Sequence, residues 1–377
     1  MTMTINNEHN KLNVPNLRFP EFQGEWAKCT LNEVCKFHNG RAYKQTELLA
    51  AGKYRVLRVG NFFTNDSWYY SNLELEDNKY AQNGDLLYAW SASFGPRFWR
   101  EEKVIFHYHI WKIDSFKNVD KNFLYHFLDL DSAKIKNEVQ GGTMVHITKG
   151  DMEKRTISYP SVPEQRNIAR FLFLLDERIA TQNKIIEDLK KLKSAISKKL
   201  LCNDKWTTYK IQDIAEIGRG RVISSVEIDR QKHPLYPVYS SQTSNDGIMG
   251  YLDNYMFDGE YITWTTDGAN AGTVFYRKGK FNCTNVCGTL KILPKFDCYF
   301  VSLVLQQATQ KYVSSNLANP KLMNNTMASI KIRMPNIETQ KQLSKVFKTL
   351  DSCLLVHQRI CKMYLSEKQY LLRQMFI

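Results

Sequence analysis

Two long stretches of the chain share one helical pattern of apolar positions. In the first stretch the apolar positions are Ile168, Leu172, Leu175, Ile179, Ile186, Leu189, Ile196 and Leu200. In the second they are Leu343, Phe347, Leu350, Leu354, Cys361, Tyr364, Leu371 and Met375. The steps alternate between four and three residues, which is the heptad pattern of a coiled-coil seam. No Pro or Gly occurs from Glu164 to Leu201 or from Glu338 to Ile377, so we predict two long helices.

The two patterns are interrupted at the same places. Gln182 corresponds to His357, and Lys193 corresponds to Lys368. The segment from Leu201 to Trp206 is short, so the second helix meets the first only by running back along it. We predict an antiparallel coiled coil with a globular domain at each end and an approximate two-fold axis. The alternative is two amphipathic helices that each dock separately on their own domain.

The globular parts also repeat. The segments that begin at Trp26 and Trp206 match at an offset of 180, which aligns Gly40-Arg41 with Gly220-Arg221. A later block matches at an offset of 175 and aligns Pro160 with Pro335, Gln165 with Gln340, and Asp176 with Asp351. Two blocks in the same order indicate an internal duplication.

Residues 26–159 and 206–334 show short β-rich runs separated by turn signals such as Asn83-Gly84-Asp85 and Asp267-Gly268. The expected strands are Tyr54–Val59, Asp85–Trp90, Lys103–Ile113, Gly259–Trp264, Gly272–Tyr276 and Gly288–Ile292, and the expected helices lie near Asn122–Asn137 and Tyr299–Ser315. We predict an α+β fold with four segments: a first recognition domain (1–160), a spacer helix (161–202), a second recognition domain (203–335) and a second spacer helix (336–377).

The net charge of the chain indicates what kind of partner it binds. The chain carries a formal net charge of +14, which favours a polyanion such as DNA. No apolar run approaches the ~20 residues of a membrane span, and the polar start of the chain carries no secretory signal. We therefore expect a cytoplasmic protein. The eight cysteines include no CxxC pair, so reduced thiols are expected, and Cys283 and Cys287 without a second ligand pair do not predict zinc.

Several groups combine side chains that can read base edges or hold phosphates. Trp26 and Trp206 precede apolar repeats and are predicted to be core residues. The candidate DNA contacts are Arg55, Arg58, Asn61, Trp90, Ser91, Ser93 and Arg97 in the first domain, and Arg219, Arg221, Tyr239, Ser241, Gln242, Thr243, Trp264, Thr265, Thr266, Asn270 and Arg277 in the second.

Sequence motifs for catalysis are missing. The chain has no GxxxxGK[ST], HExxH or GxSxG motif, and no Asn-Pro-Pro-aromatic motif of the amino-methyltransferases. His107 and His109 alternate on a predicted strand, where a structural or surface role is expected. We predict a non-catalytic chain whose partner subunits carry any chemistry.

With these residues in view, the chain resembles the specificity subunit of type I restriction–modification enzymes. The resemblance lies in Pro15–Phe22 with Gly24 and Trp26, in Pro160–Arg166 with Leu175-Asp176, and in Asp258–Val274. It covers nearly the whole length. One departure is that Ile337-Glu338-Thr339-Gln340 stands where the first copy has Val162-Pro163-Glu164-Gln165.

The resemblance implies that each recognition domain reads one half of a bipartite, asymmetric site in double-stranded DNA. It implies that the helices set the spacing and dock two modification subunits, which methylate adenine N6, while two restriction subunits add ATP-driven translocation and cleavage. No cofactor is expected on this chain, whereas S-adenosylmethionine, ATP and Mg are expected on the partners. The alternatives are a specificity module of a related restriction enzyme, a standalone duplicated DNA-binding protein, or an enzyme in its own right.

Overall fold

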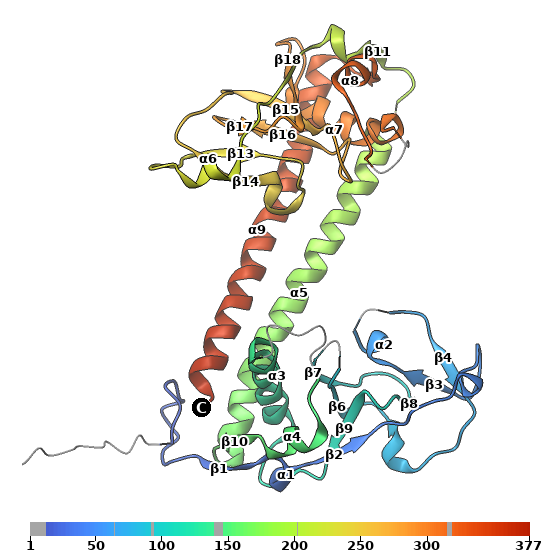
Figure 1. Cartoon of the computed structure of the whole chain (residues 1–377), viewed down its shortest axis with the longest axis vertical. Helices are drawn as coiled ribbons and strands as arrows, with labels where there is room; N and C mark the ends of the chain where they lie inside the picture. The colour runs from blue at the N-terminus through green and yellow to red at the C-terminus, as the bar shows by residue number, and fades with distance from the viewer. Residues whose placement is uncertain (1–12, 64, 92–93, 139–145, 202, 315–318) are drawn as a thin grey trace, which may run out of the picture. The chain divides into compact units, whose positions relative to one another are not determined.

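The structure is a computed structural model that describes residues 13–63, 65–91, 94–138, 146–201, 203–314 and 319–377. The chain divides into two compact units (Figure 1). Unit 1 comprises Met1–Gln182 and Ile360–Ile377, and unit 2 comprises Asn183–Arg359. Each long helix is shared between the units, so the units do not follow the four predicted segments.

Unit 1 contains two four-stranded sheets, with strand orders β2-β9-β6-β7 and β4-β3-β8-β5, and a separate antiparallel pair β1-β10. The buried core of the first sheet continues into α3 and the first half of α5. Its elements are β1 (Ala27–Thr30), α1 (Leu31–Val34), β2 (Lys36–Asn39), β3 (Tyr54–Leu57), α2 (Val59–Phe63), β4 (Tyr69–Ser71), β5 (Tyr80–Ala81), β6 (Leu86–Ala89), β7 (Gly95–Phe98), β8 (Val104–Phe106), β9 (Ile110–Asp114), α3 (Lys121–Glu138), α4 (Lys149–Lys154), β10 (Thr156–Tyr159) and α5 (Val162–Leu200).

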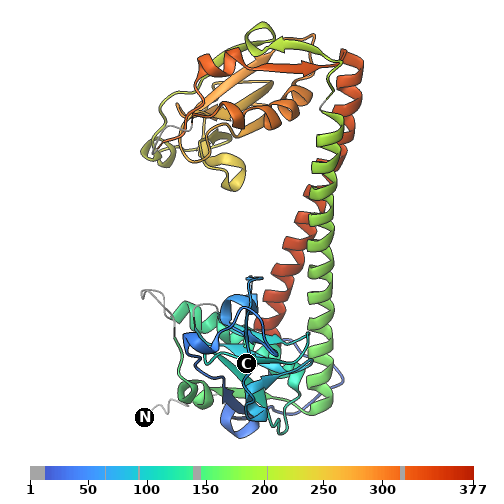
Figure 2. The same cartoon turned by 90° about the vertical axis from the view of Figure 1, so that its right-hand side faces the viewer.

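Unit 2 repeats this plan with a four-stranded sheet β12-β18-β15-β16, a three-stranded sheet β14-β13-β17 and the pair β11-β19. Figure 2 shows α7 against one face of the larger sheet. Its elements are β11 (Thr207–Lys210), β12 (Ala215–Arg219), α6 (Ser225–Asp229), β13 (Tyr236–Tyr239), β14 (Ile248–Leu252), β15 (Glu260–Thr265), β16 (Val274–Lys278), β17 (Asn282–Cys283), β18 (Cys287–Ile292), α7 (Cys298–Ala308), α8 (Asn324–Ser329), β19 (Lys331–Met334) and α9 (Ile337–Met375). The predicted α+β fold with an internal repeat is confirmed.

The two matching sequence blocks pair with each other in each unit. Ala27 faces Tyr159 where β1 pairs with β10, and Thr207 faces Met334 where β11 pairs with β19. These registers are identical once the offsets of 180 and 175 are applied. The first tryptophan of each copy then packs edge-on against a phenylalanine, with ring centroids 6.0 Å apart for Trp26–Phe123 and 5.9 Å for Trp206–Phe300. Trp26 is buried as predicted, whereas Trp206 is only half-buried against its core.

A buried glutamine holds the start of each long helix to its globular domain. The Gln165 side chain accepts a hydrogen bond from the Asp120 N–H (2.6 Å) and donates to the Pro160 carbonyl (2.8 Å). Gln340 repeats both bonds, with the Asp297 N–H (2.9 Å) and the Pro335 carbonyl (2.8 Å). Both side chains are shielded from water, so these bonds face no competition from solvent. They join the last strand, the first turn of the domain helix and the long helix.

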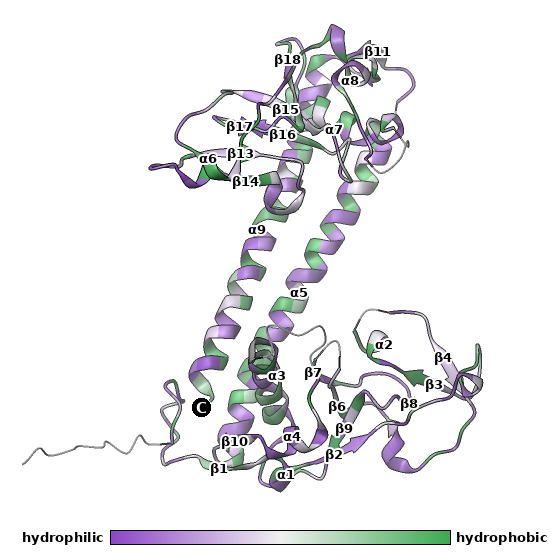
Figure 3. Ribbon diagram, in the orientation of Figure 1, coloured by the Kyte–Doolittle hydropathy of each residue, from purple (hydrophilic) through white to green (hydrophobic). Residues whose placement is uncertain are grey.

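The two helices run antiparallel within each unit. In unit 1, Asp176 of α5 lies 2.7 Å from Lys368 of α9, and in unit 2 Lys193 of α5 pairs with Asp351 of α9. The two ion pairs are copies of each other at the offset of 175. They explain why a lysine interrupts each apolar pattern, because each lysine finds a carboxylate on the opposite helix. Figure 3 shows apolar residues alternating with polar residues along both helices.

The predicted seam residues all turn away from solvent to some degree. Seven members are buried, namely Ile168, Leu172, Leu175, Phe347, Cys361, Leu371 and Met375. The remaining members are half-buried, namely Ile179, Ile186, Leu189, Ile196, Leu200, Leu343, Leu350, Leu354 and Tyr364. Both helices therefore turn these positions away from solvent, while the coiled-coil seam itself stays a prediction.

The segment before Trp26 explains the departure at Thr339. Arg18 forms a two-bond ion pair with the buried carboxylate of Glu164, at 2.7 and 2.8 Å. An offset of 175 places Thr339 at the position of Glu164, and an offset of 180 places Lys198, inside α5, at the position of Arg18. In unit 2 the preceding chain is already helical, so an acidic residue at 339 would be buried without that partner.

Two expected elements differ from those observed. The run Lys103–Ile113 is two strands, β8 and β9, joined through residues 107–109, where the Ile110 N–H donates to the His107 carbonyl at 2.9 Å. The second domain helix, expected over Tyr299–Ser315, ends at Ala308 and is followed by a short 3-10 turn at Gln310–Tyr312. Both predicted elements were too long, because they were drawn from apolar content and ran across a local turn.

Gln340→Leu should destabilise the chain by about 3 kcal/mol, because it leaves the Asp297 N–H and the Pro335 carbonyl buried without partners. Urea unfolding should show a lower midpoint with an unchanged slope. Gln342→Leu is the matched control, since Gln342 is exposed on the same helix. Equal urea midpoints for the two variants would show that the buried Gln340 amide does not stabilise the chain.

His126 makes the stability of unit 1 depend on pH. Its side chain is buried on α3, with its ring 4.5 Å from Phe173, and burial followed by the charge of Lys368 lowers its pKa to about 3. The unfolded chain binds the proton more tightly, so this stability is complete above about pH 6.5 and is lost as the pH falls toward the folded pKa. Between pH 7.5 and 5 the loss should be about 2 kcal/mol.

The measurement is urea unfolding of the wild type and of His126→Leu at both pH values. The variant should lose less stability on acidification, because the other histidines are common to both proteins. His233→Leu, at an exposed position, should keep the wild-type difference. A wild-type pH dependence in His126→Leu would contradict the assignment.

Candidate nucleic-acid interface

The predicted arginines fall into two groups. Four form ion pairs within their unit: Arg55 with Glu101 (2.9 Å), Arg219 with Asp267 (3.1 Å), Arg277 with Asp246 (2.7 Å), and Arg221 with Glu227. Arg58 and Arg97 form no ion pair with any carboxylate in the described ranges. Because an internal carboxylate competes with a phosphate or a base for the guanidinium, Arg58 and Arg97 are the stronger candidates.

Arg221 belongs to the repeated scaffold. Arg41 pairs with Glu47 in unit 1 at 2.7 Å, and both residues match the Arg221–Glu227 pair at the offset of 180. The glycine before each arginine is equally constrained, since a Cβ at Gly40 or Gly220 would lie 2.3 or 2.1 Å from a backbone oxygen. The Gly-Arg motif is therefore explained by packing, which favours a structural role for Arg221 over a DNA contact.

Arg58 opens onto a cavity of about 300 Å³ in unit 1. The residue directly follows β3, and its guanidinium carbon lies 5.3 Å from the ring centre of Tyr69 on β4. His107 and His109, from the turn between β8 and β9, line the same cavity, as does the predicted Asn61. Asn61 donates to the carbonyls of Asn65 (2.9 Å) and Ser67 (2.7 Å), so it shapes the loop that forms one wall.

The two histidines of this cavity are neutral at physiological pH. Burial, and then the neighbouring His109 and Arg58, lower the pKa of His107 to about 4. Burial also lowers the pKa of His109, with smaller contributions from His146 and Arg58. Each imidazole therefore offers one donor and one acceptor beside a permanently charged guanidinium. The strand expected through both histidines is interrupted, since His107 forms an isolated β-bridge with Arg41 directly after β8 and His109 lies in the turn before β9. The signal available in the sequence was the polar His-Tyr-His interruption between two apolar runs.

Trp90 contacts the His109 ring that lines this cavity, with ring centroids 5.0 Å apart. The Trp90 indole donates to the Tyr108 carbonyl at 2.8 Å and stacks on Trp111 with ring centroids 5.8 Å apart. Ser91 is buried, which removes it as a directly exposed base contact. Ser93 lies outside the described residues. Arg97 is exposed on β7, 4.9 Å from the ring centre of Phe63.

Three residues of unit 2 that were predicted to contact DNA do not lie at the surface. Trp264, Thr265 and Thr266 are all buried. Trp264 and Thr265 end β15, a central strand with neighbours on both edges, and the Trp264 indole donates to the Leu322 carbonyl at 2.9 Å. The sequence singled these residues out by their hydrogen-bonding chemistry, but helix α7 packs on β15 and the loop at Leu322 contacts Trp264.

Arg277, another predicted DNA contact, is buried as well. Its side chain is only 3% exposed and lies between Tyr239, 3.6 Å from the ring centre, and Phe275, at 4.4 Å. It also donates to the Asp246 carbonyl at 2.8 Å. A guanidinium enclosed in this way holds the loop at 244–247 in place and is not accessible to a base without rearrangement. Tyr239 is half-buried in the same stack.

The remaining predicted residues of unit 2 come together in two adjacent loops. The Asn270 side chain donates to the Ser241 carbonyl at 3.1 Å. Gln242 donates to the carbonyl of Ile248, and Thr243 is exposed. Arg219 lies beside this region, held by Asp267 and the Thr266 hydroxyl at 3.1 Å each. This cluster is the candidate reading surface of unit 2.

The thiols offer no exposed ligand pair here. Cys283 and Cys287 are both buried, and burial raises the pKa of each thiol. Nowhere in the described ranges do three or more His, Cys, Asp or Glu side chains gather as metal ligands would. No helix in the described part of the chain is long and apolar enough to cross a membrane.

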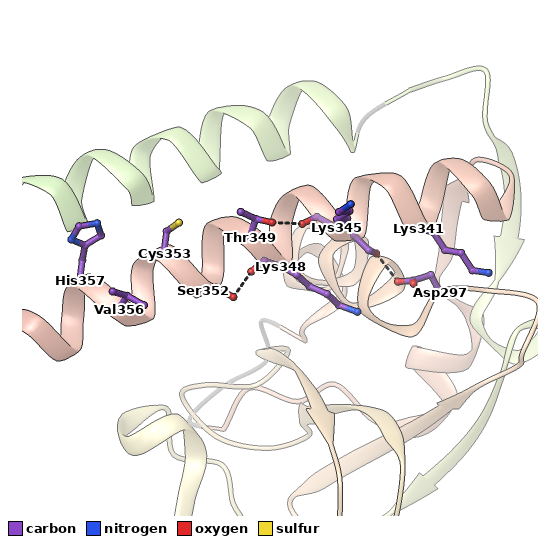
Figure 4. Close-up of a pocket in the computed structure, with 10 residues that line it drawn as sticks. Asp297, Lys341, Lys345, Lys348, Thr349, Ser352, Cys353, Val356 and His357 are labelled. Carbon is purple, nitrogen blue, oxygen red and sulfur yellow. Dashed lines mark hydrogen bonds between the residues drawn. The ribbon is translucent and has the colours of Figure 1, made fainter.

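A second hollow, of about 580 Å³, follows α9 within unit 2 (Figure 4). Lys341, Lys345 and Lys348 line one end, and Cys353, Val356 and His357 line the other. Val346 and Val356 are 44% and 51% exposed, although both are apolar. His357, which stands at an interrupted seam position, also lines the hollow, so the hollow borders the seam.

Comparison with known proteins agrees with the duplication. The model of the type I restriction modification DNA specificity domain matches residues 23–191 and again residues 203–362. The chain is 38% identical over 198 residues to a putative type I specificity subunit, S.MpnORF201P, of Mycoplasma pneumoniae, which covers 52% of this chain and 82% of that protein. It is 43% identical over 145 residues to the type I restriction enzyme MpnII specificity subunit of the same organism, covering 38% of this chain and 43% of that protein.

The fold agrees with a crystal structure of the S subunit of a type I restriction–modification system from M. genitalium. The TM-score is 0.69 at 18% identity, over 97% of this chain and 99% of that one. The family model covers both copies of the repeat found in the sequence and in the two units. The chain therefore belongs to the type I restriction modification DNA specificity domain family, and it carries two copies of that domain.

Proposed function

We propose that this chain is the subunit that gives a type I restriction–modification complex its DNA sequence specificity. The observation that carries the proposal is the presence of two specificity domains in one chain. In each copy the joint to the long helix is kept while the loops that face solvent differ. A subunit of this kind needs constant geometry in its spacer and variable chemistry in its readers.

Each globular domain would read one half of a bipartite, asymmetric site in double-stranded DNA. Unit 1 offers Arg58, Asn61 and Arg97, and unit 2 offers Ser241, Gln242, Thr243 and Asn270, with Arg219 beside them. The 39 residues of α5 correspond to about 58 Å of helix. That length is of the order of one and a half turns of DNA, which suits a spacer between two half-sites.

The chain itself would be non-catalytic and would bind no cofactor. We infer that two modification subunits bind S-adenosylmethionine and methylate adenine N6. Two restriction subunits would use ATP and Mg for translocation and cleavage, and the complex would act in the cytoplasm. The support is the family membership together with the absence from the sequence of the nucleotide-binding and methyltransferase motifs.

The hollow along α9 would dock a modification subunit. Cys353 and Val356 line the hollow and are both exposed, and Lys341, Lys345 and Lys348 form a cationic rim beside them. An amphipathic helix with acidic flanks has the shape and charge to fit such a surface. The half-site readers and the partner surface would then lie on different elements.

Exchange of residues 206–334 for the corresponding domain of a relative should change one half of the recognised site only. Sequencing of methylated bases in a host that carries the complete system would show a bipartite motif with one new half and the original spacer. The unmodified system is the control. A motif that remains unchanged, or that changes in both halves, would contradict the half-site assignment.

Val356→Glu should weaken co-purification of the modification subunit at least tenfold, because the partner would have to bury a carboxylate in an apolar contact. Gln358→Glu adds the same charge at an exposed position two residues away, and it should leave co-purification unchanged. Retention of the modification subunit by Val356→Glu would place the docking surface elsewhere.

A further inference from the structure

The side chains that line the cavity beside Arg58 are not repeated at the equivalent positions of unit 2, although both units build the same backbone scaffold there. The His107 N–H donates to the Leu57 carbonyl and the Thr284 N–H donates to the Tyr239 carbonyl, each at 2.9 Å. The Trp90 N–H donates to His109 and the Thr266 N–H donates to Val286 in the same way. These bonds identify equivalent positions in the two domains.

The equivalent positions carry different side chains. Arg58 follows Leu57 where Ser240 follows Tyr239, His107 corresponds to Thr284, and His109 corresponds to Val286. Unit 2 therefore forms the same strands and turn without an arginine or a histidine at these places. The fold therefore does not require Arg58, His107 and His109 at these positions. In this respect they differ from the Gly-Arg motif, which both units share and which has a structural role.

The chemistry of the cluster is that of a hydrogen-bond donor site. Arg58 is exposed and forms no ion pair in the described parts of the chain, and its guanidinium lies over the Tyr69 ring. Its guanidinium offers only donors in a planar fork. In the major groove guanine presents two adjacent acceptors, N7 and O6, whereas adenine presents an acceptor beside a donor. Neutral His107 and His109 add donors without the charge repulsion that two imidazolium ions would bring.

We propose that Arg58, Tyr69, His107 and His109 form a guanine-reading subsite for the half-site recognised by unit 1. This inference rests on the proposed function. Arg58 contacts the guanine edge, Tyr69 holds the guanidinium plane, and the histidines complete the wall. Unit 2 lacks the cluster, so its half-site is read by other groups at the corresponding position.

The test replaces unit 1 residues with those that unit 2 uses, through Arg58→Ser and His107→Thr. The complete system is expressed with each variant, and methylated bases are mapped in the host. With Arg58→Ser, one G·C position in one half of the motif should become degenerate, while the other half and the spacer length stay the same. His107→Thr should relax the same position.

Binding of the purified complex provides the second readout. Arg58→Ser should weaken binding to the cognate site about tenfold to a hundredfold and should abolish discrimination against a site with that guanine replaced. Uniform weakening on all sequences, with a salt dependence reduced by about one ion, would mean a phosphate contact and would overturn the proposal. Relaxation at an A·T position would overturn it as well.

Arg100→Ser is the control, since it removes the same side chain from an exposed position that lines a different hollow. Its methylation motif should match the wild type, and a relaxed position in this variant would argue against a specific role for Arg58. Melting temperatures of the variants check folding. If the wild-type system itself yields no bipartite methylated motif, the proposed function fails, and this result is distinct from a wild-type motif that Arg58→Ser leaves intact.

Discussion

The buried amide at the start of each long helix is the interaction on which the remaining architecture depends. Gln165 and Gln340 each bind the N–H at the start of the domain helix and the carbonyl that ends the last strand. One side chain thereby fixes the direction in which the long helix leaves the domain. Because both partners are backbone groups, the joint tolerates change in the surrounding side chains, and two domains with different surfaces can present the same helix geometry.

The seam shows how a duplicated chain keeps its register. Apolar residues at heptad positions supply burial, but a heptad pattern alone permits sliding by one repeat. The paired charges Asp176–Lys368 and Lys193–Asp351 remove that freedom, since a shifted register would leave each charge without its partner. Where the chain context differs, the copies differ as well: Glu164 has Arg18 as its partner, and Thr339 replaces it where that partner is missing.

Divergence is concentrated at the solvent-facing loops above this common frame. The repeated Arg41–Glu47 and Arg221–Glu227 pairs show which polar residues belong to the scaffold. The residues that differ at equivalent backbone positions, such as His107 and Thr284, are then the ones available for function. Internal comparison of two copies therefore separates structural arginines from candidate readers, a distinction that composition and charge cannot make.

The sequence by itself determined the duplication, the two helices, their seam and the class of partner, because periodicity and repeated motifs are local properties of the chain. It also pointed to Arg58 and Asn61, which line the cavity of unit 1. Only the tertiary structure decided that Trp264, Thr265, Thr266 and Arg277 are buried, since burial depends on which strand is central and on what covers it. It likewise placed His109 in a turn after the β-bridge of His107, so that both histidines line the cavity with Arg58. The pairing of Arg55, Arg219 and Arg277 with carboxylates depends on contacts between residues far apart in the chain, and no local pattern encodes those contacts.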